Sequence, residues 1–437
     1  MLSAAGKDFI MREEYILAIV MLGLVALVLA FTKNDRKWWT PALLLAAVAG
    51  SLAAGMGLRF REIVEGSFGF LDALLPVVMA ALFLRMLKDN GAWDLLFDKL
   101  AGRSPLGASF GLLFYLALPG MLTGCASMGV LMSAVPVYDY LQKKNVPKSK
   151  AVSFIAAGSF LGMMLPPNCL PAIIAANGAG SVLPTPYVGF FLPLLVLSAP
   201  AFLLCGLLFA GLFKDEPAAA PAAEKKASLL PLFPLGLVLL LVLIDGLLGS
   251  YLYIGGQTLV FLIGLVLAAL LPAVKRNAKG VLSSLMQGIT DCALPVAAVF
   301  ALGSFIEVSS MNGIRGVYSL LILPYSTTAV MLALMALSLL VGFFFSAPLP
   351  AFFIAYAVFP IGWLANTVTV TGCAAAIGLA WLIACRGGLV SLVRDELSLP
   401  EVSYKETVPG LLLAGLPVLL MAVLLVVFGD SMTGLIL

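Results

Sequence analysis

The sequence predicts an all-α, polytopic membrane protein made of two inverted repeats, each with five membrane crossings and one re-entrant hairpin. Three observations predict this fold: an apolar composition, two sets of six apolar segments around a polar linker, and motifs that recur between the two sets. Of the 437 residues, 62% are hydrophobic and 11% are charged, whereas soluble chains carry about 25% charged residues. We therefore expect most of the chain to lie in a lipid bilayer.

Motifs for catalysis and for metal binding are missing from the sequence. It has no His, its six Cys form no CxxC or metal-like spacing, and it carries no Walker motif or Ser/His/Asp arrangement. An ATPase, a hydrolase or a zinc protein therefore has no support, and we expect neither an enzyme nor a resident cofactor. A net charge of +3 without a basic run also gives no sign of nucleic-acid binding.

The apolar segments are arranged as six, a linker and six. The first run has no convincing small-residue cleavage site, so we interpret it as a membrane helix and not as a removed signal peptide. Residues 214–228, polar and rich in Ala and Pro, are predicted to link a first repeat at 1–213 to a second at 229–437. The segments lie at about 14–31, 40–57, 67–87, 106–140, 149–177, 186–212, 229–248, 254–273, 287–307, 327–362, 367–392 and 407–428.

Short motifs recur at corresponding places in the two sets. Each match is weak, and their common spacing carries the prediction of an internal repeat. The pairs are Asp72–Pro76 with Asp291–Pro295, Asn90-Gly91 with Asn312-Gly313, Thr123–Ser127 with Ser346–Pro350, and Pro166–Asn168 with Cys385–Gly388.

The segments at 106–140 and 327–362 are too long for one crossing and carry Gly or Pro at their centres. This pattern is typical of a re-entrant hairpin, which enters and leaves the membrane on the same face. If both are hairpins, each repeat makes five crossings, and an odd number of crossings inverts the second repeat.

The segment at 149–177 is interrupted by Pro166-Pro167-Asn168. Because proline has no N–H, the carbonyls of Gly162 and Met163 should lose their helical partners. Their free oxygens would suit a cation, and the N-terminus of the second half-helix, near Asn168, would suit an anion. The alternative interpretation is a kinked structural helix. The corresponding break of the second repeat, in the segment at 367–392, is Cys385-Arg386-Gly387-Gly388.

The distribution of positive charge predicts the topology. With the hairpins as assigned, 18 of the 25 Lys and Arg lie on one face, five lie on the other, and Arg85 and Arg386 lie inside segments. If the third and ninth segments are the hairpins instead, 16 Lys and Arg lie on one face and seven on the other, which is a weaker bias. The richer face is cytoplasmic by the positive-inside rule. We therefore expect a cytoplasmic linker and both termini outside, in the periplasm.

Inverted repeats, broken helices and paired hairpins together are typical of a secondary transporter. The competing interpretation is a channel or a membrane scaffold protein. A channel would need a continuous polar lining, and the segments offer few polar residues outside the two breaks.

The first half resembles the large membrane subunit of TRAP transporters. The resemblance lies in Leu122-Thr123-Gly124-Cys125-Ala126-Ser127, in the small-residue stretch Ala156–Asn168 that ends in Pro-Pro, and in the stretch from Ser181 to Leu195; in the second half it covers only the layout. It implies the ion transporter superfamily fold, an elevator mechanism, and transport of a carboxylate with sodium. It also implies two partners, a periplasmic solute-binding protein and a small four-helix membrane subunit. A stand-alone carboxylate carrier of the same superfamily, coupled to sodium or protons, is the alternative.

Two departures from the TRAP pattern bear on the sites. In the first repeat, Asn168 stands where the family usually has serine, and Cys125 stands where a serine is common. In the second repeat, Arg386 stands where a second Pro-Pro or Gly-rich break is frequent. An asparagine carbonyl still ligates sodium, so the first cation site is retained as a prediction. Arg386 would take the place of a second sodium ion or bind the substrate carboxylate. Its alternative role is to snorkel to the cytoplasmic face.

These arguments yield a set of candidate residues in a bacterial inner-membrane protein. The carboxylates Asp72 and Asp291 are candidates for coupling, or else stabilise helix N-termini; the hydroxyls at the hairpin tips bind ions, or else pack helices. The expected substrate-binding residues are Thr123, Gly124, Ser127, Asn168, Ser346, Arg386 and Gly387. The expected sodium ligands are Gly124, Cys125, Gly162, Met163, Pro166 and Asn168.

Overall fold

The computed structural model describes residues 4–101, 104–178, 188–213, 229–248, 256–271, 277–361 and 366–436. All regular structure in these ranges is helical, which agrees with the predicted all-α class. The predicted linker at 214–228 lies outside the described residues.

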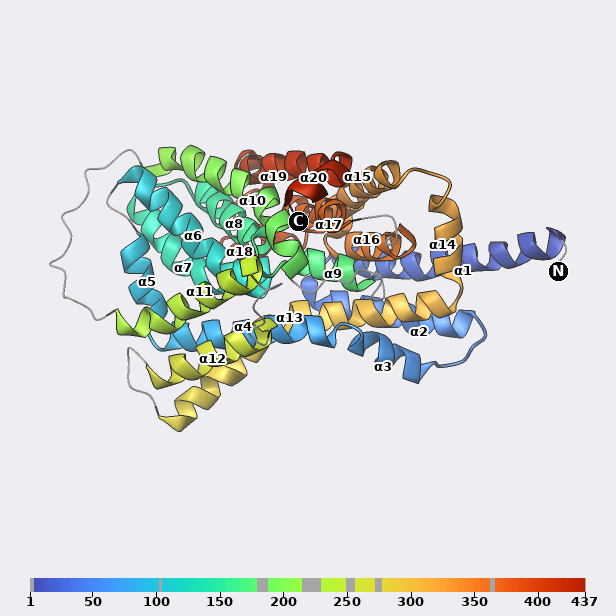
Figure 1. The fold of residues 1–437 in the computed structure, drawn as a ribbon, viewed down its shortest axis with the longest axis horizontal. Coiled ribbons are helices and arrows are strands. Elements are labelled where there is room, and N and C mark those ends of the chain that lie inside the picture. Colours follow the sequence, from blue (N-terminus) through green and yellow to red (C-terminus); the bar gives the residue numbers. More distant parts are fainter. Residues whose placement is uncertain are drawn as a thin grey trace.

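The first half contains a helical hairpin followed by a broken helix (Figure 1). The hairpin consists of α6 (Pro105–Thr123) and α7 (Ala126–Lys143), and the broken helix of α8 (Lys148–Met164) and α9 (Leu170–Gly178). The other elements are α1 (Ala4–Phe31), η1 (Arg36–Trp38), α2 (Trp39–Ala53), α3 (Phe60–Phe68), α4 (Leu71–Asp89), α5 (Ala92–Leu100), α10 (Val188–Phe209) and η2 (Ala210–Phe213).

The second half repeats the same order of elements. Its hairpin consists of α15 (Thr327–Phe345) and α16 (Pro348–Ile361), and its broken helix of α17 (Thr367–Ile383) and α18 (Leu389–Glu396). The other elements are η3 (Leu230–Leu232), α11 (Phe233–Leu248), α12 (Gly256–Leu270), α13 (Ala278–Met311), α14 (Ile314–Ile322), α19 (Tyr404–Val427) and α20 (Gly429–Ile436).

Local signals set helix boundaries at corresponding places in the two halves. Gly91 and Gly313 precede α5 and α14 with φ of +77° and +75°, a left-handed conformation that glycine adopts without strain. The Ser104 and Ser326 side chains cap the first helix of each hairpin by accepting a bond from a backbone N–H three residues on, at 3.0 and 3.3 Å. The same chemistry therefore starts both hairpins.

The halves differ where the first has a bend. Helices α3 and α4 meet at 55°, whereas α13 runs unbroken for 34 residues. Asp291 therefore lies in the middle of α13, and the expectation that it sits near a helix start is wrong. Gly288 stands three residues before Asp291, as Gly69 does before Asp72, but Gly69 caps the end of α3 whereas Gly288 is buried inside α13.

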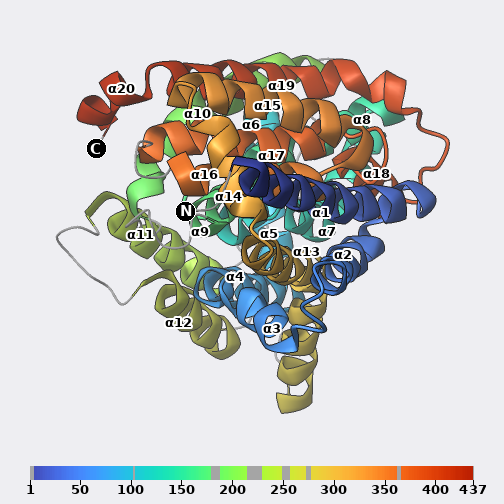
Figure 2. The same ribbon diagram turned by 90° about the vertical axis from the view of Figure 1, so that its right-hand side faces the viewer.

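The helices pack into two groups. The first, called here the scaffold group, comprises α1–α4, α12 and α13; the second, the hairpin group, comprises α6–α10 and α15–α19. Packing is extensive within each group and sparse between them. In Figures 1 and 2, α3, α4, α12 and α13 occupy the lower part of the molecule, and α10, α15, α17 and α19 the upper part.

In the described ranges, seven helices are long and apolar enough to cross a membrane, or eight if the bent pair α3–α4 counts as one span. This count bears out a polytopic membrane protein. It is lower than ten crossings partly because α2 and α12 have 15 residues each. At 1.5 Å per residue such a helix covers roughly 22 Å of a hydrocarbon core about 30 Å thick.

Candidate functional site

The tip of the first hairpin is a two-residue turn. Helix α6 ends at Thr123, Gly124 adopts φ of +70°, and α7 begins at Ala126. The Thr123 hydroxyl donates to the Pro119 carbonyl at 2.6 Å and accepts from the Cys125 N–H at 3.3 Å. This hydroxyl therefore holds the turn together, in addition to any role in binding.

The first break lies against this tip. Helix α8 ends at Met164, Leu165 is extended, and α9 begins at Leu170 after Pro166-Pro167-Asn168. The Asn168 N–H donates to the Met121 carbonyl at 3.3 Å, and the Leu170 N–H to the Gly124 carbonyl at 3.1 Å. The sequence-predicted residues of the tip and the break thus lie together.

Asn168 is fully buried between the tip and the break. Its side-chain N–H₂ donates to the Leu122 carbonyl at 2.6 Å, whereas its Oδ1 has no hydrogen-bond partner among the described residues. A buried carbonyl oxygen without a partner costs free energy unless a ligand or an ion satisfies it. Asn168 Oδ1 is therefore a free acceptor at this site.

The carbonyls before the break do not behave alike. The Leu165 N–H donates to the Leu161 and Gly162 carbonyls at 3.0 and 3.2 Å, so the expectation that the Gly162 carbonyl is free is wrong. The reason is that Leu165 precedes the prolines and still has an N–H. As the helix ends, this N–H also reaches the carbonyl three residues earlier, that of Gly162. The Met163 carbonyl receives no bond from the described residues.

Two serines near the first tip are buried without partners. Ser127 Oγ, in the first turn of α7, and Ser159 Oγ, on α8, have no hydrogen-bond partner in the described part of the chain. A Cβ added to Gly129 would lie 2.8 Å from Ser159 Oγ, so Ser159 faces α7. Sequence reasoning selected Ser127 but missed Ser159, although it stands in the small-residue stretch before the break.

The second tip and the second break lie together as well. The Cys385 N–H donates to the Phe343 carbonyl at 3.1 Å, which parallels the bond from Asn168 to Met121. Ser346, with φ of +59°, donates from its hydroxyl to the Gly387 carbonyl at 3.3 Å. The Trp381 indole N–H donates to the same carbonyl at 3.3 Å. The predicted residues Ser346 and Gly387 are therefore in direct contact.

Arg386 lies apart from this contact. Its side chain is exposed and has no hydrogen bond or ion pair among the described residues, whereas its backbone carbonyl accepts a bond from Asn34 Nδ2 at 2.7 Å. Asn34 in turn accepts from the Trp39 indole at 3.4 Å. Asn34 and Trp39, which sequence reasoning missed, hold the second break against the start of α2.

The two candidate coupling carboxylates lie apart from the tips. Asp72 is exposed in the first turn of α4, which fits the alternative role at a helix N-terminus. Asp291 forms an ion pair with Arg85 at 3.3 Å, and Arg85 also pairs with Asp89 at 3.0 Å. This network joins α4 to α13 within the scaffold group.

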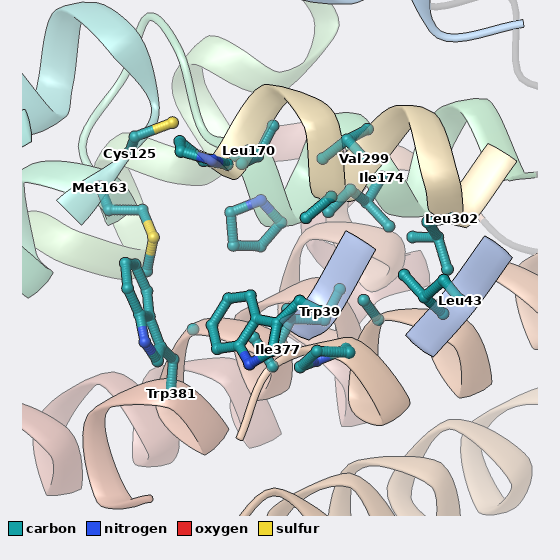
Figure 3. Close-up of a pocket in the computed structure, with 17 residues that line it drawn as sticks. Trp39, Leu43, Cys125, Met163, Leu170, Ile174, Val299, Leu302, Ile377 and Trp381 are labelled. Carbon is teal, nitrogen blue, oxygen red and sulfur yellow. The ribbon is translucent and has the colours of Figure 1, made fainter. Parts of the chain in front are cut away.

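An apolar cavity of about 80 Å³ lies between the two tips and the scaffold group (Figure 3). Cys125, Met163, Leu170 and Ile174 line it from the first half of the hairpin group, and Ala347, Ala351, Ile377 and Trp381 from the second. Trp39, Leu43, Pro295, Val299 and Leu302 line it from the scaffold group. In Figure 3 the Met163 side chain reaches toward the Trp381 indole. The edge of one of the Trp39 and Trp381 rings faces the other, with centroids 6.2 Å apart.

A second, charged cavity of about 300 Å³ adjoins the first and shares Trp39, Pro295 and Trp381 with it. We call it the charged vestibule, because its lining residues Asp35, Lys37 and Asp395 are exposed. The remaining lining is Arg36, Ser127, Leu131, Asp291, Leu294, Leu392 and Glu396. Burial lowers the pKa of Arg36, and the nearby carboxylate of Asp395 opposes this effect. The first turn of α7 lies at the junction, because Cys125 lines the apolar cavity and Ser127 the vestibule.

Comparison with known proteins places this fold. No family model matches the chain, and no curated protein matches it in sequence. Among solved structures, the chain is similar to the Alcanivorax borkumensis YdaH transporter, whose crystal structure is described as having an unusual topology. The TM-score is 0.62 at 16% identity, and the match covers 84% of this chain and 87% of that chain.

At this identity the likeness concerns the fold. In its described residues the chain is an all-helical, polytopic membrane protein whose fold resembles that of the YdaH transporter.

Proposed function

We propose that this protein is a stand-alone secondary transporter of small organic anions of the carboxylate class, driven by a cation gradient across the bacterial inner membrane. The observation that carries this proposal is that two hairpin tips meet two helix breaks beside one apolar cavity. Broken helices at such a place offer free N–H groups to an anion and free carbonyls to a cation.

The stand-alone form is preferred to a TRAP large subunit because of the fold comparison. The match to the YdaH transporter covers 87% of that chain, so the shared fold is nearly complete in one polypeptide. A TRAP-like complex with a periplasmic solute-binding protein and a small four-helix subunit is the second candidate. It is favoured by the run from Leu122 to Ser127 and by the Pro166-Pro167 break.

For the anion, we propose a site built from the tips and the breaks. Helices α7 and α18 begin without a side-chain cap, so their first N–H groups are available. Ser127 adds an unpartnered hydroxyl. The other proposed contacts are Thr123, Gly124, Asn168, Ser346, Gly387 and, by reorientation of its exposed side chain, Arg386.

Sodium is the proposed coupling ion. It is transported together with the substrate and is not a resident cofactor. The proposed ligands are Asn168 Oδ1 and the Met163 carbonyl, neither of which has a hydrogen-bond partner among the described residues, with the backbone of Gly124, Cys125 and Pro166 beside them. Oxygen ligands of this kind suit a hard cation. A proton-coupled carrier is the alternative within this proposal.

The elevator mechanism is supported by the two packing groups. Two inverted repeats would contribute one hairpin and one broken helix each to a moving hairpin group, while the scaffold group stays fixed. The sparse packing between the groups makes such a sliding motion feasible. The linker and the vestibule are proposed to face the cytoplasm, and both termini the periplasm.

Uptake into proteoliposomes tests the proposal. The purified chain alone should accumulate radiolabelled carboxylates when an inward sodium gradient is imposed, and protein-free liposomes should not. Uptake that follows a proton gradient but ignores sodium would select the proton-coupled alternative. A requirement for an added binding protein and small subunit would select the TRAP-like complex. Uptake that ignores both gradients and the membrane potential would contradict secondary transport.

A further inference from the structure

The apolar cavity and the charged vestibule together restrict the substrate. No charged or hydroxyl side chain lines the apolar cavity in the described part of the chain. Its volume is about 80 Å³, whereas an apolar cavity of about 150 Å³ accommodates one benzene ring. By that measure the cavity has room for roughly three carbon atoms.

The junction of the two cavities suits one anionic group. The first N–H groups of α7 point out of the helix there without a side-chain cap. Ser127 Oγ, on the same turn, is nine-tenths buried and has no partner among the described residues. Both donors lie on the turn of α7 where Cys125 lines the apolar cavity and Ser127 lines the vestibule.

A second carboxylate has no favourable place here. In the apolar cavity it would lose its hydration without gaining a partner, which costs several kcal/mol or leads to protonation. In the vestibule it would meet Asp35, Asp291, Asp395 and Glu396, against Arg36 and Lys37. Arg36 is already paired with Asp395 at 3.1 Å, so the vestibule has little positive charge to offer.

From this geometry we infer that the substrate is a monocarboxylate with a short apolar chain of about three or four carbons, such as butyrate or isovalerate. The carboxylate binds the first turn of α7 and Ser127, and the chain enters the apolar cavity between Val299 and Ile377. This inference rests on the proposed function and names its substrate class.

The test is uptake of acetate, butyrate, isovalerate, hexanoate and succinate by the purified full-length chain in proteoliposomes. We expect butyrate and isovalerate to be taken up best, with apparent affinity rising about fourfold per methylene from acetate to butyrate. Hexanoate should be weaker because its chain exceeds the cavity, and succinate should not be transported.

Two variants change the size of the cavity without changing its charge. Ile377→Ala enlarges it and should move the optimum from butyrate toward hexanoate, whereas Ala351→Val should favour acetate. Ile155→Ala, a truncation of a fully buried isoleucine on α8 that does not line the cavity, is the matched control and should leave the order of substrates unchanged. If Ile377→Ala does not fold, Ala351→Val carries the same test.

The outcomes separate the two proposals. Transport of succinate in preference to the monocarboxylates overturns this inference and leaves a carboxylate transporter. An unchanged chain-length order in both cavity variants overturns it as well. Uptake of none of the five acids overturns this inference, whereas the proposed function is overturned when uptake ignores both gradients and the membrane potential.

Discussion

The two polar atoms of the Asn168 side-chain amide have different roles, one structural and one proposed for binding. Its nitrogen fixes the last turn of α6 through the Leu122 carbonyl, and its oxygen remains free in a fully buried place. The family pattern has serine here, whose hydroxyl is too short to repeat both contacts from the same backbone position. The departure from serine is thus explained by geometry that one sequence does not reveal.

Asn168→Leu should abolish sodium-dependent uptake, and Asn168→Ser should weaken it. Leucine leaves the buried Leu122 carbonyl unpaired, which costs about 1–3 kcal/mol of folding stability, and removes the free oxygen. Serine keeps an oxygen, so we expect its sodium half-saturation to rise about tenfold, which corresponds to about 1.4 kcal/mol. Uptake at graded sodium and thermal unfolding in detergent measure the two effects.

Asn90→Leu is the matched control for this substitution. Asn90 is also buried and donates to a carbonyl, that of Ala268, at 2.6 Å, but it lies within the scaffold group. It should lose similar stability while keeping the sodium dependence of the remaining uptake. Equal sodium dependence in Asn168→Leu and in the wild type would remove Asn168 from the cation site.

Gly124→Ala should disrupt the packing of the first hairpin tip against the first helix break. Gly124 has φ of +70°, and a Cβ there would lie 2.8 Å from the Leu170 nitrogen, whose N–H donates to the Gly124 carbonyl. Gly55→Ala is the control, since Gly55 has φ of +69° but no atom within 4 Å of the added Cβ. Both changes carry about 1–2 kcal/mol of backbone strain. Only Gly124→Ala should also abolish uptake; equal uptake in the two variants would show that the close docking is dispensable.

At the scale of the elements, the sequence predicts breaks better than continuity. The two hairpin segments and the two breaks follow from Gly and Pro inside apolar runs, because these residues remove hydrogen bonds that lipid does not replace. The unbroken α13 was not predicted, since the match between Asp72–Pro76 and Asp291–Pro295 gave no sign of what precedes each aspartate. The two copies of this motif therefore keep the same spacing, although a helix begins just before one copy and runs straight through the other.

Arg85 joins α4 to α13 and gives Asp291 a structural role. Its guanidinium pairs with Asp89 and Asp291 and also contacts Gln287. We expect Asp291→Asn to keep cation-coupled uptake, because the amide oxygen still accepts from Arg85. Arg85→Leu should destabilise the protein by about 3 kcal/mol, since two partly buried carboxylates lose their counterion.

Thermal unfolding and uptake at graded cation concentration distinguish these outcomes, with the exposed Asp72→Asn as the control. Loss of cation dependence in Asp291→Asn alone would assign coupling to Asp291 and contradict the structural role.

At the scale of the whole molecule, the cavity is the part that sequence reasoning could not supply. Trp39 and Trp381 lie 342 positions apart and face each other only because α2 packs beside the second break. No spacing rule connects them, since each lies in an ordinary apolar segment. By contrast, the meeting of each tip with its own break follows from elements that are close in sequence.

The polar contacts between the two packing groups cluster around the vestibule. Three of them are the Arg36–Asp395 ion pair at 3.1 Å, the Asn34 bond to the Arg386 carbonyl at 2.7 Å and the Lys88 bond to the Leu131 carbonyl at 2.9 Å. Each joins the scaffold group to the hairpin group. An elevator motion must therefore break all three.

A cross-link across this boundary should stop transport. Arg36→Cys with Asp395→Cys, joined by a short bifunctional methanethiosulfonate reagent, ties the scaffold group to the hairpin group. Lys148→Cys with Glu401→Cys is the control, because that ion pair, at 2.7 Å, lies within the hairpin group. Cys385, the one native cysteine that is not buried, is first replaced by serine in both pairs. We expect uptake to fall to background in the first pair only and to return with a reductant, because only that link opposes a relative displacement of the groups. Full uptake by the cross-linked Arg36–Asp395 pair would mean that the two groups move as one body, and the elevator would be abandoned.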